Sequence, residues 1–323
     1  MIYQGKNLVG IKQQIQKIKF INEPYTKWKW RQRKVSYGKE NQDKTFFVIR
    51  RASCKVGLFS HVMTNMGLLD DAVRKGYIPV IDMQNTDNTY LEPGQVGNVN
   101  AWEFYFRQPA GYGLEDIAHS KNIILSDGII TEKNDYPDIH IVNNEDRLLR
   151  WRNVFQKYLK IEDNLLKEFQ LEKEKKFGNN RVLGVLARGT DYVNLRPRNH
   201  PVQPTAVQIM EKAKEVMDRY SCTYIFLATE DQAIYEAMKK QFGDRLLSVE
   251  TTRYITTGDE NINDMHGRRS ADRYLKGKEY LMSVWLLSEC NCLVAGNVGG
   301  THGALLMSSG YEYSYIFDLG LYC

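Results

Sequence analysis

The chain has 323 residues, of which 42% are hydrophobic and 26% are charged, and its formal net charge is +5. This composition is typical of a globular protein long enough for two domains, and it excludes a disordered or fibrous chain. The mild positive charge suits an anionic ligand or surface but is too small for a nucleic-acid-binding protein. Five scattered cysteines show no zinc spacing, and no run approaches the roughly 18 apolar residues of a spanning helix. We therefore expect a protein of the cytoplasm.

The N-terminal region predicts a helix and then a basic, aromatic segment. Ile11, Ile15 and Ile18 have helical spacing, and we expect Pro24 to end that helix. The segment from Lys27 to Lys34 interleaves cations with two tryptophans, a pattern that suits an anionic membrane at its inner face. The alternative is a solvated basic strand whose tryptophans pack on the protein.

Residues 45–82 have the pattern of a first βαβ unit. The glycine fingerprint of a dinucleotide site is absent, but Gly57 precedes the helix, where it is expected to face a ligand. His61 closes the same turn and is a candidate for acceptor binding. The predicted elements are strand 45–49, turn 56–61, helix 62–74 and strand 77–82.

Residues 83–113 form a long irregular segment rich in asparagine, glycine and aromatic residues. Rings and amides of this kind bind sugars, because pyranose faces stack on rings and hydroxyls bond to amides. Packing of a lid is the alternative. We take Trp102 and Glu103 as candidates for acceptor binding.

A strand at 122–125 and a helical region at 145–176 follow, and Gly178 begins the best linker in the chain. We therefore expect two domains, 1–178 and 179–323. The second half alternates strands and helices, which predicts a parallel sheet covered on both faces. Its predicted strands are 182–186, 224–228, 246–249, 292–295 and 315–317, and its predicted helices follow Pro204, start at Thr229 and span 279–289. The fold class is thus α/β, with two Rossmann-like domains facing a cleft.

Polar side chains follow two of the buried strands in this half. Arg188 and Asp191 come after strand 182–186, at the carboxyl end where α/β sheets bind ligands. An Arg–Asp pair that only fixes the loop is an equal alternative. Glu230 and Asp231 follow strand 224–228, but Thr229 and Gln232 also match a capping box, so these acids could serve only the helix start.

A glycine-rich turn at residues 296–303 lies between strand 292–295 and an apolar helix that we expect to begin at Ala304. Glycines let backbone amides approach a ligand, and the amides of a helix N-terminus favour phosphate. The turn therefore predicts a phosphate-binding loop. Its candidate donor-binding residues are Asn297, Gly299, Gly300 and Thr301.

Together these motifs resemble those of the GDP-fucose-dependent α1,2-, α1,6- and protein O-fucosyltransferases. The matching stretches are Val-Leu-Gly-Val-x-x-Arg-x-Thr-Asp from Val182, Phe-Leu-Ala-Thr-Glu-Asp from Phe226, and the run from Leu286 to Val294. The resemblance covers about residues 182–310. It implies two Rossmann-like domains of the GT-B type, a nucleotide site in the second, an inverting reaction and no metal.

By this resemblance Arg188 holds the diphosphate, and the turn at 296–300 surrounds the phosphates. The chain also departs from the family pattern, because Leu186 and Gly189 stand where a histidine and a second arginine are common. Ser283 stands where relatives carry an aspartate that reads guanine, and Glu279 lies one turn earlier as a substitute. The donor site is therefore expected to include both residues.

The sequence thus predicts a metal-independent, inverting glycosyltransferase of polysaccharide biosynthesis, with GDP-fucose as donor and a glycan acceptor that could be lipid-linked. Arg188 would neutralise the departing diphosphate, and a carboxylate would take the acceptor's proton, with Asp191 the first candidate and Glu103 the second. A donor other than GDP-fucose is one alternative. An inactive protein of this fold that binds nucleotides or glycans is another.

Overall fold

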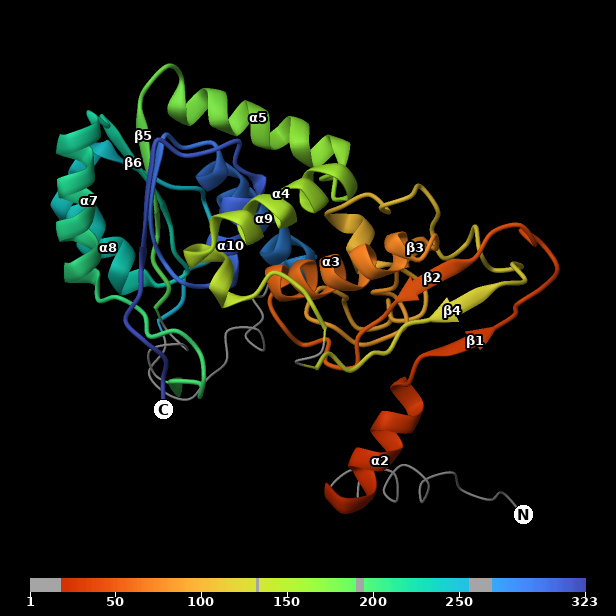
Figure 1. Cartoon of the computed structure of the whole chain (residues 1–323). Coiled ribbons are helices and arrows are strands. Elements are labelled where there is room, and N and C mark those ends of the chain that lie inside the picture. The colour runs from red at the N-terminus through yellow and green to blue at the C-terminus, as the bar shows by residue number, and fades with distance from the viewer. Residues whose placement is uncertain (1–18, 132–133, 190–194, 256–268) are drawn as a thin grey trace, which may run out of the picture.

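A computed structural model describes residues 19–131, 134–189, 195–255 and 269–323, and for residues 19–22 it describes the backbone alone. Two β-sheets lie beside each other with helices packed around them (Figure 1). The strands are β1 (Arg33–Val35), β2 (Phe46–Ile49), β3 (Ile78–Ile81), β4 (Ile123–Leu125), β5 (Val182–Leu186), β6 (Tyr224–Ala228), β7 (Leu246–Leu247), β8 (Cys292–Gly296) and β9 (Tyr313–Phe317). The predicted α/β class is confirmed.

The described part of the chain contains both α-helices and short 3-10 turns. The α-helices are α2 (Lys19–Trp30), α3 (Leu58–Arg74), α4 (Glu145–Tyr158), α5 (Asp163–Phe177), α7 (Ala206–Tyr220), α8 (Gln232–Phe242), α9 (Asp272–Ser288) and α10 (Gly299–Met307), and the short 3-10 turns are η1 (Ala101–Phe104), η2 (Ile139–Asn143) and η3 (Gly243–Arg245). No helix in the described parts of the chain is long and apolar enough to cross a membrane.

The first sheet has the strand order β1-β4-β2-β3, in which β1 alone runs antiparallel to its neighbour. All four residues of β2 are buried, because both faces of the sheet are covered. Phe47 and Ile49 face α3, whereas Phe46 and Val48 face the segment that contains Ile117. A short apolar run buried on two sides is what a parallel strand requires.

The second sheet has the order β7-β6-β5-β8-β9 and is parallel throughout. Helices α7 and α8 cover one face and α9 covers the other (Figure 1). Close packing explains Gly184 in the central strand, since a Cβ there would lie 3.0 Å from Leu287 and 3.2 Å from Cys290. The carboxyl ends of β5, β6 and β8 therefore open at the same edge of the sheet.

Helix α10 connects the two halves. A Cβ at Gly303 would overlap the ring of Phe59 on α3, so glycine permits the two helices to touch. The Arg152 guanidinium of α4 donates two hydrogen bonds, of 3.1 and 3.0 Å, to the carbonyl of Leu305. Helix α5, which precedes the predicted domain boundary after residue 178, packs on α9 through Phe169. That boundary stays a prediction.

Several helix boundaries differ from those predicted. Helix α3 starts at Leu58 rather than at residue 62, and α9 starts at Asp272 rather than at residue 279. The start of α9 was missed because its first turns are polar and contain Gly277, where a Cβ would overlap the hydroxyl of Tyr105. The helical region 145–176 is two helices, because Glu162 caps the start of α5.

Other corrections concern single residues. Helix α2 continues through Pro24, since a proline removes one backbone donor without having to end a helix; the isoleucines predicted before it lie outside the described residues. Asp231, not Thr229, caps α8, and its side chain accepts from the amide of Ile234 at 3.0 Å. Helix α10 begins at Gly299, five residues before the predicted start.

Candidate functional site

A cavity of about 420 Å³ lies between the start of α3 and the carboxyl edge of the second sheet. Residues from both halves of the chain line it, which agrees with the predicted cleft. Its lining consists of Lys55, Val56, Gly57, Phe59, Ser60, Tyr90, Leu186, Arg188, Leu195, Pro197, His200, Ala228, Thr229, Glu230, Thr251, Thr252, Tyr254, Lys276, Glu279, Tyr280, Ser283, Val298 and Gly299.

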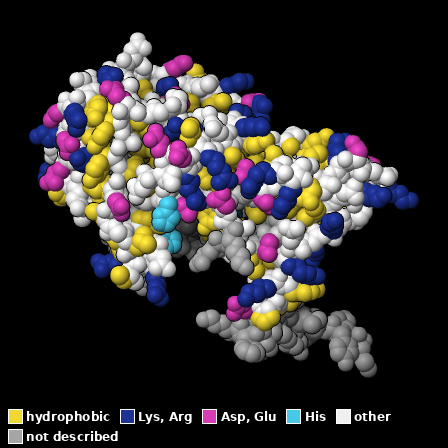
Figure 2. Space-filling view, in the orientation of Figure 1, with side chains coloured by type: hydrophobic (Ala, Val, Ile, Leu, Met, Phe, Trp, Pro, Cys, Tyr) yellow, Lys and Arg dark blue, Asp and Glu magenta, His cyan; other side chains and the backbone are white. Residues whose placement is uncertain are grey.

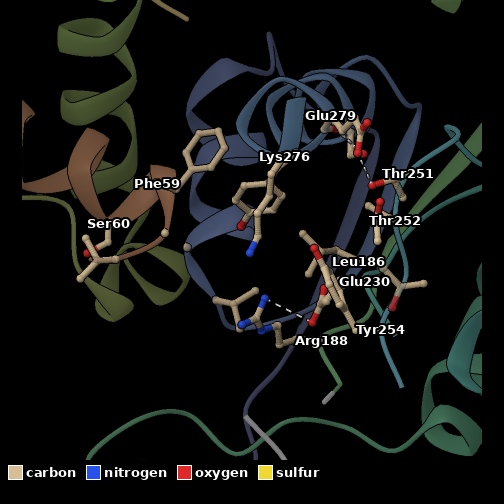
Figure 3. A pocket seen from close by; sticks show the side chains of 18 of the residues that line it. Phe59, Ser60, Leu186, Arg188, Glu230, Thr251, Thr252, Tyr254, Lys276 and Glu279 are labelled. Carbon is tan, nitrogen blue, oxygen red and sulfur yellow. Dashed lines mark hydrogen bonds and ion pairs between the residues drawn. The ribbon is translucent and has the colours of Figure 1, made fainter. Parts of the chain in front are cut away.

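Arg188 and Glu230 meet at the floor of this cavity. Each is the second residue after the end of its strand, and because β5 and β6 are parallel neighbours their carboxyl ends place the two side chains together. The Arg188 Nη1 lies 3.2 Å from the Glu230 Oε1, and each side chain is about one-fifth exposed (Figure 3). The sequence thus correctly placed both residues at the strand ends, where a ligand can reach them.

Two helix N-termini also open onto the cavity. Gly57 is the N-cap of α3 and Val298 is the N-cap of α10, and neither residue caps its helix with a side chain. Gly57, Val298 and Gly299 line the cavity. Backbone amides at a helix start carry partial positive charge and bind anions. The two helix starts and Arg188 therefore surround the cavity with groups suited to phosphate.

Helix α9 contributes one face to the same wall. Lys276, Glu279, Tyr280 and Ser283 all line the cavity, and their spacing of three, four and seven residues is that of one helical face. The Lys276 side chain points into the cavity toward the side where Arg188 lies (Figure 3). Lys276 was not predicted as a site residue, because the helix was expected to start at residue 279, three residues after Lys276.

Glu279 and Ser283 make protein contacts within this wall. The Glu279 carboxylate accepts from Arg269 and, at 3.0 Å, from the hydroxyl of Thr251. The hydroxyl of Ser283 donates to the carbonyl of Glu279 at 2.9 Å. A carboxylate has lone pairs for further donors, so Glu279 combines a fixed position with capacity to accept hydrogen bonds from a base.

Four of the predicted donor-binding residues do not line the cavity and instead have positions or contacts within the protein. Asp231 caps α8, and Gly300 lies inside α10. Thr301 is fully buried, and its hydroxyl donates to the carbonyl of Gly296. The amide of Asn297 donates to the carbonyl of Ile139 at 3.1 Å. Gly300 and Thr301 lie within α10 because this helix starts earlier than the sequence indicated.

Two acceptor candidates are in the core. Burial lowers the pKa of His61 to about 3, and its Nε2 lies 3.1 Å from the carbonyl oxygen of Cys54. Trp102 has no exposed surface, and its ring stacks on Phe106. Both side chains therefore pack within the protein, and their contact with an acceptor stays a prediction.

The predicted carboxylates have different positions. Glu103 is exposed and lines a second cavity, of about 780 Å³, on the first half of the chain. Asp191 lies outside the described residues. The 420 Å³ cavity is also lined by Lys55, Thr251 and Tyr254. These residues were not predicted, because they lie in irregular segments where the sequence has no periodic pattern. No cluster of three or more metal-ligating side chains occurs in the described part of the chain.

No protein-family model matches the sequence, and no curated protein matches it. A solved structure does: the fucosyltransferase NodZ from Bradyrhizobium is 16% identical, with a TM-score of 0.51 over 85% of this chain and 96% of that one. The fold is that of the GT-B fucosyltransferases. This confirms, for the fold, the resemblance that the motifs indicated.

Two further solved structures match with slightly lower TM-scores. One is NodZ alpha-1,6-fucosyltransferase soaked with GDP-fucose, which is 17% identical with a TM-score of 0.49 over 82% of this chain and 93% of that one. The other is POFUT1 in complex with GDP, at 13% identity and a TM-score of 0.49 over 85% and 99%.

Proposed function

We propose that the chain is an inverting, metal-independent glycosyltransferase that transfers fucose from GDP-fucose to a glycan acceptor. The observation that supports this most is the composition of the cavity in a GT-B fold: Arg188 at a strand end, with two helix N-termini, at Gly57 and Gly299, on its wall. Such groups bind a diphosphate and stabilise the charge that develops on it as it leaves.

In this mechanism Arg188 and the helix amides do the work that a divalent cation does in metal-dependent transferases. A carboxylate on the opposite side of the sugar takes the proton from the acceptor hydroxyl, which then displaces the diphosphate in one step and inverts the anomeric carbon. Asp191 is the first candidate for this base. Glu103 is the second, although it lines the other cavity. In this proposal Glu279 and Thr251, which are hydrogen-bonded to each other at 3.0 Å, contact the nucleoside.

The decisive experiment combines binding with turnover. The purified protein is incubated with GDP-fucose, GDP-mannose, UDP-glucose or UDP-N-acetylglucosamine, with excess EDTA, and released nucleoside diphosphate is measured without acceptor. We expect GDP-fucose to raise the melting temperature of the protein, since a ligand that binds the native state stabilises it. We also expect slow hydrolysis of GDP-fucose that continues in excess EDTA. Hydrolysis of a UDP-sugar instead would reassign the donor. Binding without turnover, with or without glycan acceptors, would indicate an inactive protein, and dependence on magnesium would contradict the mechanism.

We further propose that the enzyme acts in polysaccharide biosynthesis in the cytoplasm and contacts the inner membrane face, where a lipid-linked acceptor would lie. Trp28 on α2 is 58% exposed, and the Arg31 guanidinium lies 4.8 Å from its ring centroid. Trp30 instead packs on the protein, since a Cβ at Gly128 would overlap its ring. Each tryptophan thus matches one of the two interpretations of this segment, and Trp28 with its neighbouring cations supports the membrane contact.

A further inference from the structure

Among the described residues, two lysines and one arginine line the 420 Å³ cavity, and they differ in position. Lys55 is at the rim, 63% exposed, with its Nζ 3.2 Å from a carboxylate oxygen of Asp87. Arg188 is at the floor beside Glu230. Lys276 comes from α9 on another wall, and its side chain extends into the cavity toward Arg188 (Figure 3). Lys276 and Arg188 therefore approach one space from two elements.

Position 189, directly after Arg188, has no room for a side chain. A Cβ at Gly189 would overlap the carboxylate of Asp231, and that carboxylate is needed to cap α8. Leu186 and Ala187, the two residues before Arg188, are buried. Any side chain at position 189 would thus displace a helix cap. Position 189 therefore does not supply a second cation, whereas α9 brings Lys276 to the same cavity.

Lys276 is held by contacts that also fix the Arg188 side of the cavity. Its Nζ lies 5.5 Å from the ring centroid of Tyr254, within the range of a cation–π interaction. The Tyr254 amide donates to the carbonyl of Glu230 at 2.8 Å, so the ring is tied to the loop that carries the partner of Arg188. Helix α9 is itself anchored, because the buried Tyr105 hydroxyl donates to the carbonyl of Tyr274 at 3.0 Å.

We propose that Lys276 binds the diphosphate of the nucleotide opposite Arg188 and makes the site selective for nucleoside diphosphates over monophosphates. This rests on the proposed function. The arginine offers a planar fork of donors, whereas the lysine is a compact charge with three rotatable donors, so the two can contact different phosphate oxygens. A monophosphate has one phosphoryl group and cannot engage both cations in the same way. Selectivity therefore depends on having two cations on separate walls.

The test is the affinity of Lys276→Met for GDP, GMP and guanosine, measured by calorimetry at low and at moderate salt. We expect GDP affinity to fall about tenfold or more, GMP affinity to fall less, and guanosine affinity to stay unchanged, because only the phosphate contact is lost. The salt dependence of GDP binding should also weaken. Lys276→Arg keeps the charge and should retain most of the preference for GDP.

The matched control is Lys278→Met, two residues along α9. Lys278 lies outside the lining, and its Nζ lies 2.7 Å from a carboxylate oxygen of Glu168 on α5, so GDP affinity should not change. If Lys276→Met does not fold, Lys276→Gln removes the charge but keeps a polar side chain, and it gives the same measurement. An unchanged ratio of GDP to GMP affinity in a folded variant would overturn the role of Lys276. Wild-type protein that binds no nucleoside diphosphate would instead overturn the proposed function itself.

Discussion

The two halves of the molecule contribute different kinds of groups to the cavity. The parallel second sheet presents charged side chains at its strand ends, Arg188 after β5 and Glu230 after β6. The first half presents mainly the backbone at the start of α3 and the ring of Phe59, and its basic residue Lys55 is at the rim. Figure 2 shows a larger and a smaller lobe with charged side chains on both. Under the proposed function, the charged diphosphate of the donor would therefore bind mainly to the second half.

A cause of this difference is the segment between β3 and β4. Its polar and aromatic residues are used to close the first half: the Asn100 and Gln108 side-chain amides both donate to the carbonyl of Ile81, which completes the edge of β3. Trp102 and Tyr105 fill the core. These four side chains therefore make packing and hydrogen-bond contacts within the first half. The following experiments test whether the two halves are divided in this way, from the largest expected effect to the smallest.

Replacement of Trp102 tests the assignment of the first half. Trp102→Ala should lower the free energy of unfolding by about 3–5 kcal/mol, since it removes a fully buried ring from the core. The matched control is Trp28→Ala, at a largely exposed tryptophan, where the change should stay within about 0.5 kcal/mol. Chemical denaturation gives both values. A Trp102→Phe variant of wild-type stability with weakened acceptor binding would restore Trp102 to the acceptor site.

Replacement of Arg188 tests the second half. Arg188→Ala should lower kcat by about 10² to 10³, or about 2.7–4 kcal/mol, more than it lowers donor affinity, because charge on the diphosphate grows in the transition state. Arg188→Lys should not restore the rate, since it lacks the planar fork. The control is Arg181→Ala, at the opposite end of β5, where the guanidinium pairs with Glu312 at the surface. Near wild-type turnover with a melting temperature several degrees lower would show that Arg188 only fixes its loop.

The pH dependence of the free energy of unfolding tests whether the buried His61 and His302 contribute to stability. Burial lowers the pKa of His61 to about 3 and that of His302 to about 4. The unfolded chain takes up these protons near pH 6.5 while the folded protein does not, so stability is full above that pH and falls as the pH drops toward 4. Each histidine contributes up to about 1.4 kcal/mol per pH unit.

This pH dependence can be measured by urea unfolding between pH 7.5 and 5. His61→Gln and His302→Gln should each flatten the fall in stability, even where they lower the stability at pH 7. A wild-type stability that stays constant down to pH 5 would show that these side chains become protonated in the folded protein. In that case they would be accessible to solvent, and His61 would again be a candidate for ligand binding.

The sequence predicted the second half better than the first, for a physical reason. A buried parallel strand is a recognisable apolar run, and the residue after it lies at the carboxyl edge of the sheet, so Arg188 and Glu230 could be placed without a structure. Whether a side chain in an irregular segment points inward depends on distant contacts, as Trp102 shows by stacking on Phe106. Lys276 could be found only from the true start of α9, where Arg269, which precedes the helix, donates to the carboxylate of Asp272 in the first turn.

The smallest expected effect concerns the basic surface of α2. Vesicles that contain acidic lipid should bind the protein, and added salt should release it, because screening weakens attraction between exposed charges and lipid headgroups. Lys27→Gln and Lys29→Gln should each weaken binding by about 1 kcal/mol, or about fivefold, since each removes one cation near the surface. Trp28→Ala should weaken it further by removing an exposed ring that can enter the headgroup region. The control is Lys121→Gln, at an exposed lysine outside α2, and this replacement should not change vesicle binding. Equal recovery with neutral vesicles, or none with either kind, would exclude the membrane contact and leave α2 as a solvated helix.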